Sequence, residues 1–172
     1  AAAAFAKPSI VSLLLEHGAN PLETDVVGND TFMYASILGR IDNVKFWLER
    51  FSDWNLERKN KTAGGVALSH AVFNGPHRLE LVKLLLDHGA STNYRTYIGS
   101  SVLITICASE DADPEVLQTL LKNKSKLIVN YKLLGGTIKW RIIYRLARFL
   151  ARFKLTNSGF IKTVALKTGI TA

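Results

Sequence analysis

The chain contains 172 residues, of which 48% are hydrophobic and 21% are charged. These values suit one domain of ordinary size, or a short array of repeats, with an ample core. No apolar run approaches the roughly 18–20 residues of a membrane-spanning helix. The single cysteine, Cys107, excludes an internal disulfide framework and a multi-thiol metal site. We therefore expect an intracellular, reducing compartment.

Charge is distributed unevenly along the chain. Residues 1–115 hold 10 Lys/Arg and all 14 Asp/Glu, a balance of −4, whereas residues 116–172 hold 12 Lys/Arg and no acid. A sign asymmetry of this size indicates a C-terminal segment that contacts something anionic. An acidic protein, a nucleic acid and membrane headgroups all have the required charge.

The octamer LLLEHGAN at residues 13–20 recurs almost unchanged as LLLDHGAS at residues 84–91. A weaker copy, FWLERFSD, lies between them at residues 46–53. Glycines follow a matching period, with spacings of 36, 35, 37 and 33 residues. These marker glycines are Gly28, Gly64, Gly99, Gly136 and Gly169. Self-similarity at such a period predicts a repeat architecture.

Each repeat is predicted to contain a turn, a short first helix, a tight turn, a second helix and a polar connector. The phrases GNDTFMYASILG and GGVALSHAVFNG begin two of the units, and RLELVKLLLDHG is a second helix. This pattern resembles the ankyrin repeat, a unit of about 33 residues built from a β-turn and two antiparallel helices. The resemblance implies an all-α solenoid of stacked helix-turn-helix units with projecting β-turn or hairpin tips.

The resemblance covers most of the chain. Residues 1–130 are predicted to form ankyrin-like repeats, in units of about 1–27, 28–63, 64–98 and 99–135. Residues 131–172 are interpreted as a degenerate basic fifth repeat, or as an amphipathic helix followed by the start of a further repeat. Neither end shows the polar capping unit that a repeat stack needs, so we expect a longer chain, or a partner that covers the ends.

Three local predictions follow from this register. Asp30 and Ser101 stand at first-helix N-caps, where a side-chain oxygen can accept from a free amide. Gly18, Gly89 and Gly159 stand where second helices end, in the position that favours a left-handed glycine. Within the second helix of the third unit, at least two of the leucines at residues 84–86 should be buried between neighbours.

The histidines and the cysteine offer little for catalysis or metal binding. His17 and His88 occupy one repeat position, just before a helix-ending glycine, where a helix-end role is expected. His70 and His77 lack a third ligand nearby. Cys107 is expected to be a buried, inert thiol. No phosphate-binding glycine motif is present, so the sequence predicts no enzyme activity, catalytic residue, metal, cofactor or small-molecule substrate.

The resemblance implies a non-catalytic scaffold that binds protein partners along its turn tips and first helices, as part of a longer chain or assembly. The candidate partner-binding residues at the tips are Arg58, Lys59, Lys61, Tyr94, Arg95 and Tyr97. Those on the first helices are Tyr34 and Phe73. Two alternatives remain open: an anion-binding module acting through the basic C-terminal third, and a non-catalytic region of a larger enzyme, channel or assembly.

The segment KWRIIYRLARFLARFK at residues 139–154 carries the strongest charge pattern. At helical spacing its arginines fall on one stripe beside an apolar face that includes Ile142, Leu146 and Phe149. The arginines are Arg141, Arg145, Arg148 and Arg152. The segment is interpreted either as two helices that turn near Ala147, or as one continuous basic amphipathic helix. In both cases we expect the four arginines on an exposed face or at an anionic partner.

Overall fold

The computed structural model describes residues 5–73, 77–107, 112–123 and 137–152. Within these ranges the secondary structure is helical, without strands. The helices are α2 (Pro8–Glu16), α3 (Thr31–Ile37), α4 (Ile41–Arg50), α5 (Ala67–Ala71), α6 (Arg78–Asp87), α7 (Val102–Cys107), α8 (Pro114–Lys122) and α9 (Ile138–Arg152). None of these helices is both long enough and apolar enough to span a bilayer.

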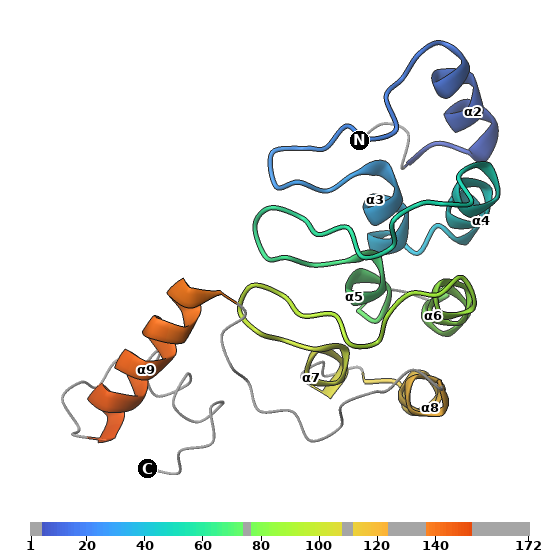
Figure 1. The fold of residues 1–172 in the computed structure, drawn as a ribbon. Helices are drawn as coiled ribbons and strands as arrows, with labels where there is room; N and C mark the ends of the chain where they lie inside the picture. The colour runs from blue at the N-terminus through green and yellow to red at the C-terminus, as the bar shows by residue number, and fades with distance from the viewer. Residues whose placement is uncertain (1–4, 74–76, 108–111, 124–136, 153–172) are drawn as a thin grey trace.

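The helices stack in two parallel rows (Figure 1). The short first helices α3, α5 and α7 form one row, and the second helices α2, α4, α6 and α8 form the other. Long turns project from the side of the first row, one above each of α3, α5 and α7. We call them tip one (residues 20–30), tip two (residues 53–66) and tip three (residues 91–101). The expected all-α solenoid with projecting tips is confirmed.

The first helices begin at polar caps that the sequence provides. The Asp30 carboxylate accepts the Met33 backbone N–H at 2.8 Å, which satisfies one free amide of α3. Before α5 the equivalent position is Val66, which has no polar side chain. There the Ser69 hydroxyl oxygen instead accepts the N–H of the cap residue itself, Val66, at 2.8 Å. Before α7, the Ser101 hydroxyl accepts the Ile104 N–H at the longer distance of 3.4 Å.

Two second helices end at left-handed glycines, as expected. Gly18 follows α2 with φ +84° and Gly89 follows α6 with φ +89°. In each case the glycine N–H bonds back to the last turn of the helix. The predicted helix end at Gly159 lies outside the described residues. His88 occupies the helix end before Gly89, with its ring Nδ1 2.8 Å from the Leu84 carbonyl oxygen.

The core lies between the two rows and continues from α2 to α8. Its largest fully buried side chains come from both rows: Phe32, Met33, Leu68, Leu81, Leu85, Ile106 and Leu120. Leu85 and Leu86 are buried and Leu84 is half-buried, so the prediction for residues 84–86 is confirmed. Each unit buries its apolar face only against its neighbours, as repeat stacking requires.

One expectation needs correction, and one open alternative is decided. Cys107 is exposed, not buried, because it is the last residue of α7, where the chain leaves the core. The segment from Ile138 to Arg152 is one unbroken helix, so no turn occurs near Ala147. Ala147 is instead buried with Tyr144, and Trp140 packs against both. The helix pairs α3–α4, α5–α6 and α7–α8 fall inside the predicted ranges 28–63, 64–98 and 99–135.

Candidate interaction surface

Each tip is closed by one polar side chain near the base of its turn. In tip one, Asp25 Oδ1 accepts the N–H groups of Val27 and Asn29 at 3.0 and 2.8 Å. In tip two, Asn60 Oδ1 accepts the N–H groups of Ala63 and Gly65 at 3.0 and 3.1 Å.

Tip three uses Thr96 in the same way. Its hydroxyl oxygen accepts the Ser100 N–H at 2.9 Å. Backbone N–H groups in a turn need hydrogen-bond acceptors. In the three equivalent tips, three different side chains supply that acceptor and fix the turn.

Successive tips are joined through backbone atoms. The Lys61 N–H donates to the Val27 carbonyl at 2.9 Å, and the Tyr97 N–H donates to the Ala63 carbonyl at 2.8 Å. The marker glycines make this approach possible. A Cβ atom on Gly28 would lie 2.5 Å from Lys61 N, and one on Gly64 would lie 2.9 Å from Tyr97 N. The three tips thus form one pre-organised row.

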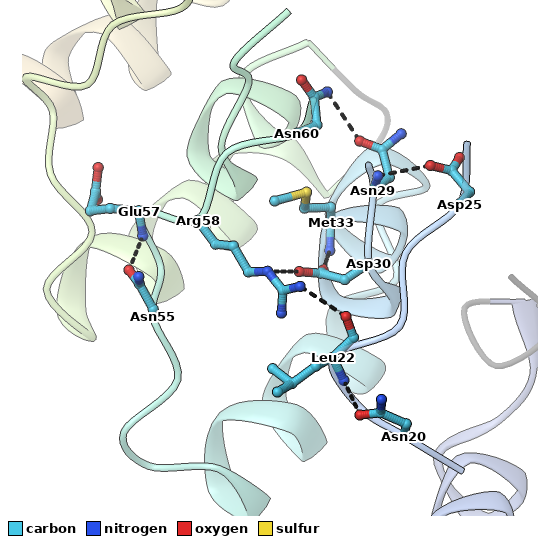
Figure 2. A network of polar contacts seen from close by, with 10 residues as sticks. All are labelled: Asn20, Leu22, Asp25, Asn29, Asp30, Met33, Asn55, Glu57, Arg58 and Asn60. Atoms are coloured by element: carbon cyan, nitrogen blue, oxygen red, sulfur yellow. Dashed lines mark hydrogen bonds and ion pairs between the residues drawn. The ribbon is translucent and has the colours of Figure 1, made fainter. Parts of the chain in front are cut away.

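Arg58 connects tip two to tip one through its side chain (Figure 2). Its Nη2 donates to the Leu22 carbonyl at 2.8 Å, and its Nε lies 3.5 Å from Asp30 Oδ2 as an ion pair. Beside it, Asn60 Nδ2 donates to Asn29 Oδ1 at 3.1 Å. The half-buried Arg58 side chain therefore cross-links two repeats.

Burial dominates the electrostatics of Asp30. It raises the pKa of that carboxyl above its ordinary value, because the charged form loses hydration. The Met33 N–H and the positive charge of Arg58 oppose this shift. Arg58 thus offsets part of the cost of the buried carboxylate that caps α3.

The other tip candidates differ in what they present to solvent. Lys59 and Lys61 are exposed, and Lys59 Nζ also donates to the Arg95 carbonyl at 2.7 Å. Arg95 and Tyr97 are half-buried, and the Tyr97 ring packs on Gly64. Lys59 and Tyr97 therefore also hold neighbouring tips together.

Tyr94 does not belong to an exposed tip surface. Its side chain is 4% exposed and packs in the core cluster. Burial raises the pKa of the Tyr94 phenol well above its ordinary value. Tyr94 lies at the base of tip three, where the chain returns toward the helices, so the expectation that it contacts a partner is corrected.

The two first-helix candidates, Tyr34 and Phe73, differ in their exposure and in their contacts. The Tyr34 hydroxyl donates to Asp25 Oδ2 at 2.6 Å, which ties α3 to tip one. This bond lowers the pKa of the Asp25 carboxyl and raises the pKa of the Tyr34 phenol. Phe73, just after α5, is 49% exposed. Tyr34 is thus half-buried with a bound hydroxyl, whereas Phe73 presents apolar surface to solvent.

Helix α9 lies against tip three. The Tyr144 hydroxyl donates to the Ile98 carbonyl at 2.7 Å, and the rings of Trp140 and Tyr144 pack 5.7 Å apart. Arg141 and Arg145 are exposed. The side chains of Arg148 and Arg152 lie outside the described part of the structure, so their predicted exposure stays a prediction.

The histidines and acids of the described ranges do not gather into a metal-binding cluster, since no three His, Cys, Asp or Glu side chains there lie closely enough to hold a metal ion. His70 is the most enclosed histidine, and burial lowers its pKa. A hollow of 330 Å³ lies between the N-terminal segment and the α3–α4 turn, lined in part by Lys7, Arg40 and Asp42.

Comparison with known proteins identifies the repeat. A family model described as ankyrin repeats (3 copies) matches residues 32–131. The chain belongs to the ankyrin-repeat family. The matched range begins at the second residue of α3 and extends beyond the end of α8. Ankyrin repeats are generally protein-interaction modules without catalytic activity.

Individual ankyrin proteins support the assignment. The chain is 28% identical over 113 residues to ankyrin repeat and SAM domain-containing protein 6 of Rattus norvegicus, and 27% identical to that of Mus musculus. Each match covers 66% of this chain but 11% of the relative, so the chain spans about a tenth of their length. Among solved structures, EF0377, an ankyrin repeat protein, superposes with a TM-score of 0.61 at 25% identity, over 70% of this chain and 61% of that one.

Several residues that build this ankyrin surface were missed by the sequence argument. Asp25, Asn60 and Thr96 close the tips, and a signal for them exists: each is polar and stands three or four residues before a marker glycine. Asp30 was assigned only as a cap. Its pairing with Arg58 joins residues 28 positions apart, and repeat spacing alone does not place their side chains together.

Proposed function

We propose that this ankyrin-repeat chain is a non-catalytic scaffold that binds a protein partner through its tips and the adjacent first helices. One observation carries the proposal: the tips are fixed to one another by backbone bonds, while Lys61 on tip two remains exposed. A surface fixed before binding loses less conformational entropy when a partner docks. The family's usual role as a protein-interaction module supports the same assignment.

Exposed Lys61 and Phe73 provide the contact chemistry, with contributions from the exposed parts of Lys59, Arg95 and Tyr97. Cations on the tips suit a partner that presents acidic groups, and the exposed ring of Phe73 after α5 offers a separate apolar contact. We place this interaction in an intracellular, reducing compartment, in keeping with the single cysteine.

Site-specific photo-crosslinking tests the proposal. A photoreactive residue at position 61 or 73 should capture the native partner, and the same residue at position 121 on α8 should not. Leu121 is the matched control because it is 49% exposed, like Phe73, but lies in the row of second helices. Capture through position 121 and not through 61 or 73 would refute binding by the tips.

We also propose an anion-binding surface in the basic C-terminal third. The support is the stretch of 12 Lys/Arg without any acid in residues 116–172, together with the exposure of Arg141 and Arg145 on α9. Replacing Arg141, Arg145, Arg148 and Arg152 by Gln should lower the salt concentration that elutes the chain from heparin, while the helical circular dichroism signal stays. Unchanged elution would refute the proposal.

A further inference from the structure

Helix α9 combines two features that the tip interaction does not use. It exposes a stripe of large apolar side chains, and it belongs to the segment without acidic residues. The stripe consists of Ile138, Ile142, Leu146 and Phe149, which are 76%, 60%, 55% and 54% exposed. Steps of four, four and three residues place them on one face of the helix.

The stripe faces away from the contact that holds α9. Tyr144 and Ala147 are buried, and at about 100° per residue they lie on roughly the opposite side of the helix from the stripe. The Tyr144 hydroxyl bond to the Ile98 carbonyl fixes this orientation against tip three. The apolar face is thus directed to solvent by the way α9 is anchored.

Cations flank the stripe on both sides. Arg141 and Arg145 are exposed along one edge, and Lys139 is exposed along the other. Long basic side chains can rest their aliphatic stems on an apolar layer while their charged ends reach anionic groups above it. A bilayer interface offers this combination along its whole plane: acyl chains below, and phosphate or carboxylate headgroups around them.

We propose that α9 docks the chain on an anionic lipid bilayer, with the stripe inserted among the headgroups and the helix parallel to the surface. The inference rests on the proposed anion-binding surface and assigns its partner. Charge complementarity favours lipid over a protein groove, because cations border both edges of the stripe and residues 116–172 contain no acid. Residues 1–115, with a balance of −4, would be oriented away from the anionic surface.

Co-sedimentation of the full chain with vesicles tests the proposal. Vesicles of phosphatidylcholine mixed with phosphatidylserine should retain the chain, and pure phosphatidylcholine vesicles should retain far less. The pair Arg141→Gln/Arg145→Gln should weaken binding about tenfold to thirtyfold at low salt. The pair Ile142→Ser/Leu146→Ser should weaken it at least about tenfold, since apolar burial is lost.

Matched controls distinguish binding through the stripe from non-specific hydrophobic adsorption and from a general effect of net charge. Leu22→Ser/Val26→Ser removes exposed apolar residues from tip one, and Lys7→Gln/Lys83→Gln removes two exposed charges elsewhere; both should leave vesicle binding unchanged. A polarity-sensitive dye at Ile142→Cys, in a Cys107→Ser background, should shift to the blue on anionic vesicles. The same dye at Val26→Cys should not shift.

Three outcomes would overturn the proposal. The first is vesicle binding that is unchanged in Ile142→Ser/Leu146→Ser and gives no dye shift, because the contact would then be electrostatic only. The second is heparin retention without vesicle binding, which leaves an anion-binding surface but removes lipid as its partner. The third is absence of vesicle binding together with one-to-one binding to an acidic protein that the same serine pair abolishes.

Discussion

Replacing Gly28 by alanine should destabilise the solenoid at the contact between tips one and two. Gly28 has φ +85°, so an alanine there incurs a left-handed backbone cost of about 1–2 kcal/mol. The added Cβ would also lie 2.5 Å from the Lys61 backbone nitrogen. Relieving that overlap separates the tips and loses the bond from the Lys61 N–H to the Val27 carbonyl, at about 0.5–1.5 kcal/mol.

Gly89→Ala is the matched control. Gly89 has φ +89°, nearly the same backbone strain, but a Cβ there would meet nothing within 4 Å. We expect Gly89→Ala to lower the free energy of unfolding by about 1–2 kcal/mol. Gly28→Ala should lower it by about 1–3 kcal/mol more, since overlap and the lost bond add to the same backbone cost.

Urea unfolding followed by far-ultraviolet circular dichroism gives both free energies, because they are proportional to the midpoint when the slope is unchanged. Equal losses for the two variants would refute the reasoning, since the close approach of the tips would then contribute nothing. A larger loss for Gly89→Ala would show that the helix end after α6 limits stability instead.

Arg58→Gln should lower the free energy of unfolding by about 1–3 kcal/mol at pH 7, because it removes the cation that stabilises the buried Asp30 carboxylate and so raises the already elevated folded-state pKa of Asp30 further. The loss should be smaller below pH 3.8, where Asp30 is protonated in both the folded and the unfolded state and no longer needs the Arg58 charge. Urea unfolding at the two pH values measures the difference. Tyr34→Phe should make stability less sensitive to acid, because the lowered folded-state pKa of Asp25 contributes stability above pH 3.8 that is lost as that carboxyl protonates; equal acid sensitivity of variant and parent would contradict this. Leu85→Ala should cost about 2–5 kcal/mol in thermal or urea unfolding, since its side chain is fully buried, and a neutral result would mean that the repeat register is wrong.

The repeat period allowed much of the fold to be predicted from the sequence. The spacing of glycines and leucines depends on local turn chemistry and on one buried face per helix, and these features recur along the described repeats. Asp30 at its cap and Gly18 and Gly89 at their helix ends were found for this reason. These positions follow rules that need only neighbouring residues.

One error concerns a position where packing between units decides. Tyr94 was taken as an exposed tip residue because aromatic residues often anchor interfaces, yet it packs into the core where tip three turns back. The pattern in residues 139–154 fits one helix or two. The single helix is held by buried Tyr144 and Ala147, and Tyr144 bonds to tip three, about 46 residues earlier in the chain. Sequence spacing does not show which of these two packings is formed.

The way the tips are joined bears on how new binding specificities could arise in this scaffold. The bonds between tips use the backbone of Val27, Lys61, Ala63 and Tyr97, so they do not require particular side chains at the exposed positions. Lys61, Thr62 and Ala63 are all exposed and can vary while their main chain stays in place. Under the tip binding proposed above, sequence drift or laboratory randomisation at residues 61–63 should change which proteins are recognised while leaving the stack intact, provided that Gly64 is kept.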